Sequence, residues 1–132
     1  RIRRYGELFE LTDDLAQPVS AYSHGMKQKL SLIAALLHEP KLMIMDEPFV
    51  GLDPKASKAV REIMRGICDG GGAIFFSTHV LEVAEKLCDK VAIISRGRLV
   101  AAGKMEDVLG RESLEDVFFE LEAESGAESA EK

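Results

Sequence analysis

Two adjacent carboxylates, Asp46 and Glu47, are the residues of this chain best suited to chemistry. They follow the apolar run Leu-Met-Ile-Met at 42–45 and precede Pro48. Apolar residues at every position of the run predict a strand in a parallel sheet that is covered on both faces, and both acids then lie at its carboxyl end. One acid can hold a metal ion while the next activates a water molecule, which is the pairing that phosphoryl transfer to water requires.

A third acid, Asp53, follows shortly afterwards within Gly-Leu-Asp-Pro at 51–54. Counting Asp46, Glu47 and Pro48, seven residue identities then stand at a fixed spacing. With each residue type at roughly 5% abundance, such a match has a chance probability on the order of 10⁻⁹. Asp is also a good N-cap and Pro suits the first helical position, so a purely local role for Asp53 stays open beside a chemical one.

Ser23 and Gly25 lie in the segment Tyr-Ser-His-Gly-Met-Lys-Gln at 22–28, directly before an apolar pattern with helical spacing that Pro40 ends. Ser23 is therefore a predicted N-cap. The amides and the positive dipole end of a helix start suit an anion such as a phosphate group, and a glycine lets the backbone approach closely. Taken alone, this segment favours the simpler interpretation that Ser23 only caps a core helix.

His79 closes Ser-Thr-His at 77–79, after a second apolar run at 73–76. If both apolar runs are parallel strands, their carboxyl ends meet at one sheet edge, which brings His79 to the edge that carries Glu47. A histidine there can hydrogen-bond a phosphate group and the attacking water.

In this order the segments resemble the C-terminal half of an ABC-type ATPase domain. The family pattern runs signature motif, Walker B strand, D-loop and switch histidine, with counterparts here at Ser23, at Asp46 with Glu47, at Asp53 and at His79. The match extends over nearly everything from about residue 5 to residue 121.

The resemblance implies a role for each matched residue, with ATP and Mg²⁺ as cofactors. By this resemblance, Glu47 would be the general base and His79 the switch. Asp46 would bind the Mg²⁺ ion through a bound water. The residues that contact ATP in trans, across a dimer of ATPase subunits, would be Ser23, Gly25 and Asp53.

Two features depart from the usual family pattern. Tyr22, His24 and Met26 replace three letters of the common Leu-Ser-Gly-Gly-Gln signature, and this variant is similar to the branch that pairs with ABC-2-type permeases, which include exporters. The sequence also contains no G-x-x-x-x-G-K-[ST] phosphate loop. We therefore expect the chain to be a fragment of a parent ATPase that lacks the Walker A half and is inactive alone.

The function implied is ATP binding and hydrolysis that powers an ABC-type membrane transporter, an exporter by its signature. The implied partners are a membrane permease and a second ATPase subunit, at the cytoplasmic face of the membrane. The alternative is a soluble ABC ATPase that acts on DNA or ribosomes, and the absence of a basic patch argues against it.

Composition and charge agree with a globular protein that does not bind nucleic acid. The net charge is −6, and residues 111–132 account for all of it with eight acids against two basic residues. Cys68 and Cys88 have no metal-ligand spacing, which favours reduced thiols. The longest apolar run, 32–37, is far shorter than the ~18 residues of a membrane helix.

The predicted fold class is α/β, a partial RecA-like P-loop NTPase core of mainly parallel sheet with flanking helices, together with part of the ABC helical subdomain. Residues 1–39 would form the end of that subdomain with the signature helix, and 40–110 the C-terminal part of the core. A short helix is predicted at 111–122, and a disordered acidic tail at 123–132 because no apolar period continues there.

The last two predicted strands, 91–94 and 99–102, are joined through 95–98 as a hairpin. In ABC-type domains the strand that feeds the phosphate loop lies between the strands that correspond to 73–76 and 91–94. Without it both strands have unpaired edges, and unpaired edges recruit other strands. We therefore expect self-association of the isolated chain or a rearranged sheet register.

Overall fold

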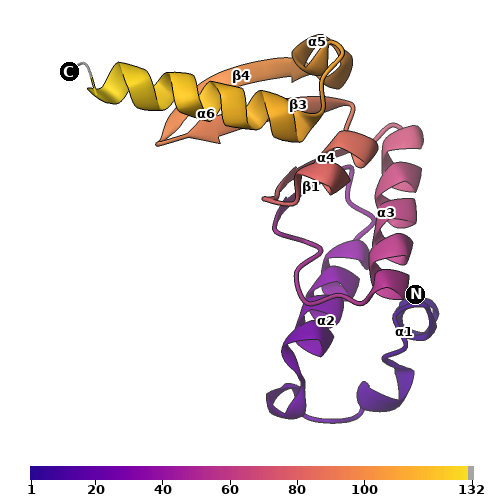
Figure 1. Ribbon diagram of the computed structural model, residues 1–132. Helices are drawn as coiled ribbons and strands as arrows, with labels where there is room; N and C mark the ends of the chain where they lie inside the picture. The colour runs from indigo at the N-terminus through magenta and orange to yellow at the C-terminus, as the bar shows by residue number, and fades with distance from the viewer. Residues whose placement is uncertain (131–132) are drawn as a thin grey trace. The chain divides into compact units, whose positions relative to one another are not determined.

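The computed structural model describes residues 1–130, which form two compact units, one of residues 1–78 and one of residues 79–130 (Figure 1). The predicted segment 1–39 lies in the same unit as residues 40–78, and the predicted core segment 40–110 contributes to both units. Both units combine helices with a pair of strands, which confirms the α/β class.

The first unit contains four helical segments before its first strand and one long helix between its two strands. In chain order these are α1 (Ile2–Leu8), the 3-10 helices η1 (Thr12–Asp14) and η2 (Val19–Ala21), α2 (His24–Leu36), β1 (Leu42–Asp46), α3 (Pro54–Asp69) and β2 (Ala73–Ser77).

Two capping residues start the long helices where the sequence predicts. The Ser23 side chain caps α2, and Asp53 caps α3 with Pro54 at its first position. The apolar spacing of Met26, Leu30, Ile33, Ala34 and Leu37 predicts one face of α2. Its buried positions are instead Leu32, Ile33 and Leu36, so the core stripe lies on a slightly different face. Tertiary packing, and not periodicity alone, selects the buried face.

The strands β1 and β2 pair in parallel, from Leu42 opposite Ala73 to Asp46 opposite Ser77. Side chains alternate between the two faces of a strand. On one face, residues of α2, β1 and α3 surround a small apolar core: Leu32, Leu36, Met43, Met45, Val60, Ile63 and Met64. This arrangement fixes the position of the β1 carboxyl end relative to both helices.

The opposite face of this sheet is exposed, which corrects the prediction of a sheet covered on both faces. Leu42 is 58% exposed, Ile44 73% and Phe75 65%. The reason is that α2 and α3 pack on the face that carries Met43. A run of apolar residues shows that a strand can be buried on both sides, but the packed elements decide whether it is.

The second unit consists of α4 (Leu81–Leu87), β3 (Lys90–Ser95), β4 (Arg98–Lys104), α5 (Met105–Leu109) and α6 (Leu114–Ala130). Strands β3 and β4 form the predicted hairpin, with a turn of two residues, Arg96 and Gly97. Both have positive φ, 51° and 74°, as two-residue hairpin turns of type I′ require. The turn is shorter than predicted because Ser95 and Arg98 pair with each other.

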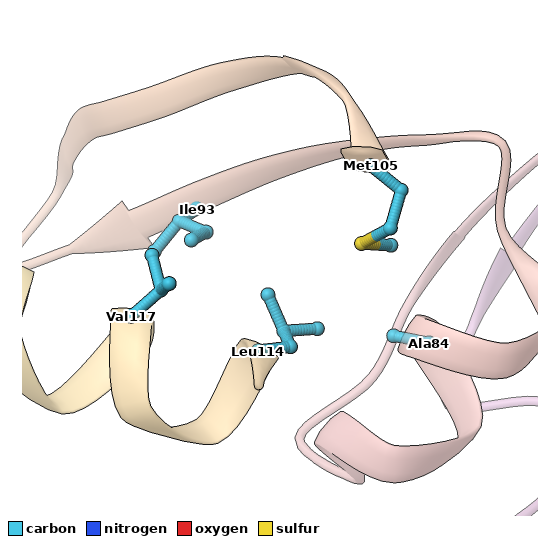
Figure 2. Close-up of a cluster of buried hydrophobic side chains, with 5 residues drawn as sticks. All are labelled: Ala84, Ile93, Met105, Leu114 and Val117. Atoms are coloured by element: carbon cyan, nitrogen blue, oxygen red, sulfur yellow. The ribbon is translucent and has the colours of Figure 1, made fainter. Parts of the chain in front are cut away.

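A buried cluster joins the strands and helices of the second unit (Figure 2). It consists of Ala84, Ile93, Met105, Leu114 and Val117. Figure 2 shows Ile93 of β3 beside Val117 of α6, while Leu114 points toward Met105. The apolar spacing of Leu114, Val117, Phe118 and Leu121 predicts the last helix, and all four residues lie in α6.

The prediction for the end of the chain is wrong over residues 123–130. Helix α6 continues to Ala130, well past the predicted end at 122. Glu and Ala are strong helix formers, so a segment rich in both extends a helix without an apolar stripe. In addition, the Arg96 side chain lies against Gly126, where an added Cβ would be 3.1 Å from a guanidinium nitrogen. Residues 131–132 lie outside the described part of the chain.

Within residues 1–130 the strands form two separate two-stranded sheets, one of β1 with β2 and one of β3 with β4. The described strands therefore show no rearranged register that joins β2 to β3. Self-association through the unpaired strand edges stays a prediction.

Candidate functional site

The carboxyl end of β1 carries Asp46, which lies opposite Ser77 at the end of β2. The Ser77 hydroxyl donates a hydrogen bond to Asp46 Oδ1. Register partners of paired strands project to the same face of the sheet, which explains why these two side chains meet. Asp46 is also exposed. The strand end thus presents a solvent-accessible carboxylate with a hydroxyl beside it.

Glu47 occupies an unusual backbone conformation, with φ at +46°. A non-glycine residue in this region costs about 1–3 kcal/mol and persists only where its surroundings hold it. Here the Glu47 N–H donates to the Ser77 carbonyl at 3.0 Å and lies 3.3 Å from the Ser77 hydroxyl. The next residue, Pro48, is fully buried. The turn that aims the second carboxylate is therefore fixed on both sides of Glu47.

Asp53 has the local role that the sequence left open. Its Oδ1 accepts a hydrogen bond from the Ala56 N–H at 2.7 Å, and its Oδ2 lies 3.9 Å from Lys29 Nζ of α2. The Lys29 side chain is only 14% exposed, whereas that of Asp53 is 52% exposed.

Nearby, the hydrogen bond with Glu10 and the negative charge of Glu10 raise the pKa of Lys55.

Ser23 forms the predicted cap at the start of α2, where its Oγ accepts a hydrogen bond from the Met26 N–H at 3.2 Å. No acidic residue lies in the first turn of this helix. The first N–H groups of a helix have no partner within the helix, and the dipole places partial positive charge there. The start of α2 therefore favours an anion.

Gly25 is required for a contact inside the first unit. A Cβ added to Gly25 would lie 2.5 Å from the carbonyl oxygen of Gly51, in the D-loop at 51–54. Gly51 itself has φ +78°, and a Cβ on it would lie 2.9 Å from the His24 ring. The sequence predicts that Gly25 allows close approach of a ligand, whereas here it allows close approach of the chain's own D-loop.

Gln28 is a contact residue to which the sequence assigns no role. Its side-chain amide donates a hydrogen bond to the Pro48 carbonyl at 3.0 Å, and it lies 3.5 Å from the Glu47 carbonyl. The first is a good hydrogen bond and the second is at the limit of one. Glutamine is a common exposed residue in helices, so the sequence carries no signal for this bond.

Five of the six predicted site residues lie in the first unit: Ser23, Gly25, Asp46, Glu47 and Asp53. The sixth, His79, is exposed and is the first residue of the second unit, two positions after the end of β2. Its position in the chain agrees with the predicted place after a strand, and its role stays a prediction.

The oxygen atoms at the ends of β1 and β2 fit the requirements of Mg²⁺. No group of three or more His, Cys, Asp or Glu side chains suited to a metal ion occurs within residues 1–130. Mg²⁺ in nucleotide sites needs no such cage, because one or two carboxylates, substrate phosphates and water suffice. The Asp46 carboxylate with the adjacent Ser77 hydroxyl provides that smaller set.

Comparison with known proteins gives consistent matches. Residues 2–85 match the family model described as "AAA domain, putative AbiEii toxin, Type IV TA system". The linearmycin resistance ATP-binding protein LnrL of Bacillus subtilis (strain 168) is 35% identical over 112 residues, which are 83% of this chain and 36% of that protein. The Nod factor export ATP-binding protein I of Rhizobium etli is 39% identical over 103 residues, 78% of this chain and 33% of that protein.

A solved structure, described as an ATP binding subunit of an ABC transporter, superimposes with a TM-score of 0.87 at 38% identity. The match covers 92% of this chain and 52% of that subunit. The chain therefore spans about a third of the curated relatives and about half of the solved subunit. With matched fold, motif order and family model, the chain belongs to the AAA domain family and, within it, groups with the ATP-binding proteins of ABC transporters.

Proposed function

We propose that this chain supplies the hydrolytic carboxylates and the trans phosphate clamp of an ATP-hydrolysing subunit that powers an ABC transporter. The observation that supports this most is the site at the end of β1, where Asp46 and Glu47 lie beside Ser77 of β2. The carboxyl ends of parallel strands are where open α/β sheets bind ligands.

Glu47 acts as the general base, which orients the attacking water and accepts its proton. The constrained backbone at Glu47 favours this role, because strained conformations cluster at active sites. Asp46 holds Mg²⁺ through a bound water, with Ser77 fixing one of its carboxylate oxygens. When bound, the ion neutralises charge that develops on the phosphate oxygens.

The start of α2 forms the trans part of the site. Ser23 and the backbone at Gly25 bind the γ-phosphate of ATP that the second subunit holds, because the helix start offers amide donors and positive potential. Asp53 couples the two subunits across the dimer, since it is half exposed beside the start of α2. His79 acts as the switch that senses whether the γ-phosphate is still attached.

The transporter is an exporter in this proposal. Two matched relatives carry names that refer to Nod factor export and to linearmycin resistance. The partners are a membrane permease and a second ATPase subunit, and the protein is held at the cytoplasmic face of the membrane by the permease. Within residues 1–130, no helix is both long and apolar enough to cross a membrane.

Glu47→Gln in the complete subunit tests the assignment of the base. The amide keeps the shape of the side chain but cannot accept the proton, so turnover is lost while ATP affinity is kept and an ATP-bound dimer accumulates. Glu62→Gln, at an exposed position of α3, is the matched control and keeps wild-type turnover. Equal loss of ATP binding and turnover in Glu47→Gln would refute the role of Glu47.

A further inference from the structure

The first two turns of α2 contact the loop at 47–53 at several points. Gly25 and His24 lie against Gly51, and Lys29 lies beside Asp53. The shortest polar contact among them is the 3.0 Å hydrogen bond from Gln28 to the Pro48 carbonyl. The start of α2 and this loop are therefore packed as one body within the first unit.

The hydrogen bond from Gln28 supports the backbone on the C-terminal side of Glu47, where no strand pairs with it. On the N-terminal side, the Glu47 N–H is bound to Ser77 of β2. On the C-terminal side the chain leaves the sheet, and the Gln28 amide binds the carbonyl one peptide further on, at Pro48. A residue before proline is sterically restricted, and φ at Glu47 is +46°, so this backbone needs support from both sides.

We propose that Gln28 is a positioning residue that fixes the Glu47 backbone relative to α2. The inference rests on the proposed role of Glu47 as general base. Because Ser23 caps the helix whose first two turns contain Gln28, the anion-binding end of α2 and the catalytic carboxylate move together. Gln28 contacts neither substrate nor water in this proposal and acts only through Glu47.

Three variants of the complete ATP-binding subunit test the proposal. Gln28→Met keeps the length of the side chain and removes the donor. Gln28→Lys keeps a flexible donor that can reach a carbonyl. Ser31→Met, at an exposed position of α2, is the matched control. The measurements are kcat and KM for ATP hydrolysis, ATP affinity, and hydrogen–deuterium exchange of the segment 42–53.

In Gln28→Met we expect kcat to fall about 10- to 100-fold, the effect of a misplaced catalytic group, with ATP affinity unchanged. Exchange at 42–53 becomes about tenfold faster because the loop opens more often. Gln28→Lys restores the wild-type kcat and the wild-type exchange, and Ser31→Met changes neither kcat nor exchange. Wild-type kcat and exchange in a folded Gln28→Met protein would overturn the proposal, as would a fall in ATP affinity that matches the fall in kcat.

Failure of the proposed function has a different outcome. If Glu47→Gln keeps full turnover, Glu47 is not the base, whereas exchange at 42–53 in Gln28→Met still reports whether Gln28 holds the loop. If Gln28→Met does not fold, Gln28→Lys tests the proposal instead. Wild-type exchange at 42–53 together with a reduced kcat in Gln28→Lys would contradict the proposal that Gln28 acts through the Glu47 backbone.

Discussion

Replacing Gly25 by alanine sets helix propensity against tertiary packing. Alanine in a helix is favoured over glycine by about 0.8–1.0 kcal/mol, so propensity alone predicts a more stable chain. However, the new Cβ would lie 2.5 Å from the Gly51 carbonyl oxygen, which is closer than carbon and oxygen atoms approach. The obstacle is backbone in a turn with positive φ, and it cannot rotate away as a side chain could.

Overpacking of this kind costs about 1–3 kcal/mol, and the propensity gain is reduced in the first turn of a helix, so the net change is a loss of about 0.5–2 kcal/mol. Gly66→Ala is the matched control. It lies inside α3, where an added Cβ meets nothing within 4 Å, so it should raise the free energy of unfolding by about 0.5–1 kcal/mol.

Urea unfolding of the 132-residue chain, followed by circular dichroism at a fixed low concentration, measures both changes. We expect the midpoint to fall for Gly25→Ala and to rise for Gly66→Ala, with equal slopes. If Gly25→Ala and Gly66→Ala are stabilised by the same amount, the contact between Gly25 and Gly51 does not constrain the fold. That result would refute the close packing of α2 on the D-loop.

Two further predictions concern the cap of α3 and the chain alone. Asp53→Ala should lower the free energy of unfolding by about 0.5–2 kcal/mol because the Ala56 N–H loses its partner. Asp53→Asn should retain most of the stability because asparagine also caps a helix. Equal stability of the two variants in urea unfolding would contradict this. The isolated chain should bind Mg-ATP only weakly because its sequence has no phosphate loop, and micromolar affinity by calorimetry would disprove that.

The sequence by itself determined the elements whose signals are local. Ser23 and Asp53 start helices because their side chains bond an N–H three residues ahead, a contact that needs no other part of the fold. The hairpin of the last two strands follows from the same kind of short-range constraint, although its turn, at Arg96 and Gly97, is shorter than the predicted connection at 95–98. The order of the motifs also identified the family, since each motif is a short string of fixed spacing.

Tertiary structure decided the features that join distant parts of the chain. Gln28 bonds a carbonyl twenty positions further on, and Gly25 meets Gly51, because α2 and α3 pack on the same face of β1. The same packing leaves Ile44 exposed in a strand whose composition predicted burial on both faces. Such contacts depend on which surfaces meet in space, and residue type and spacing along the chain do not specify that.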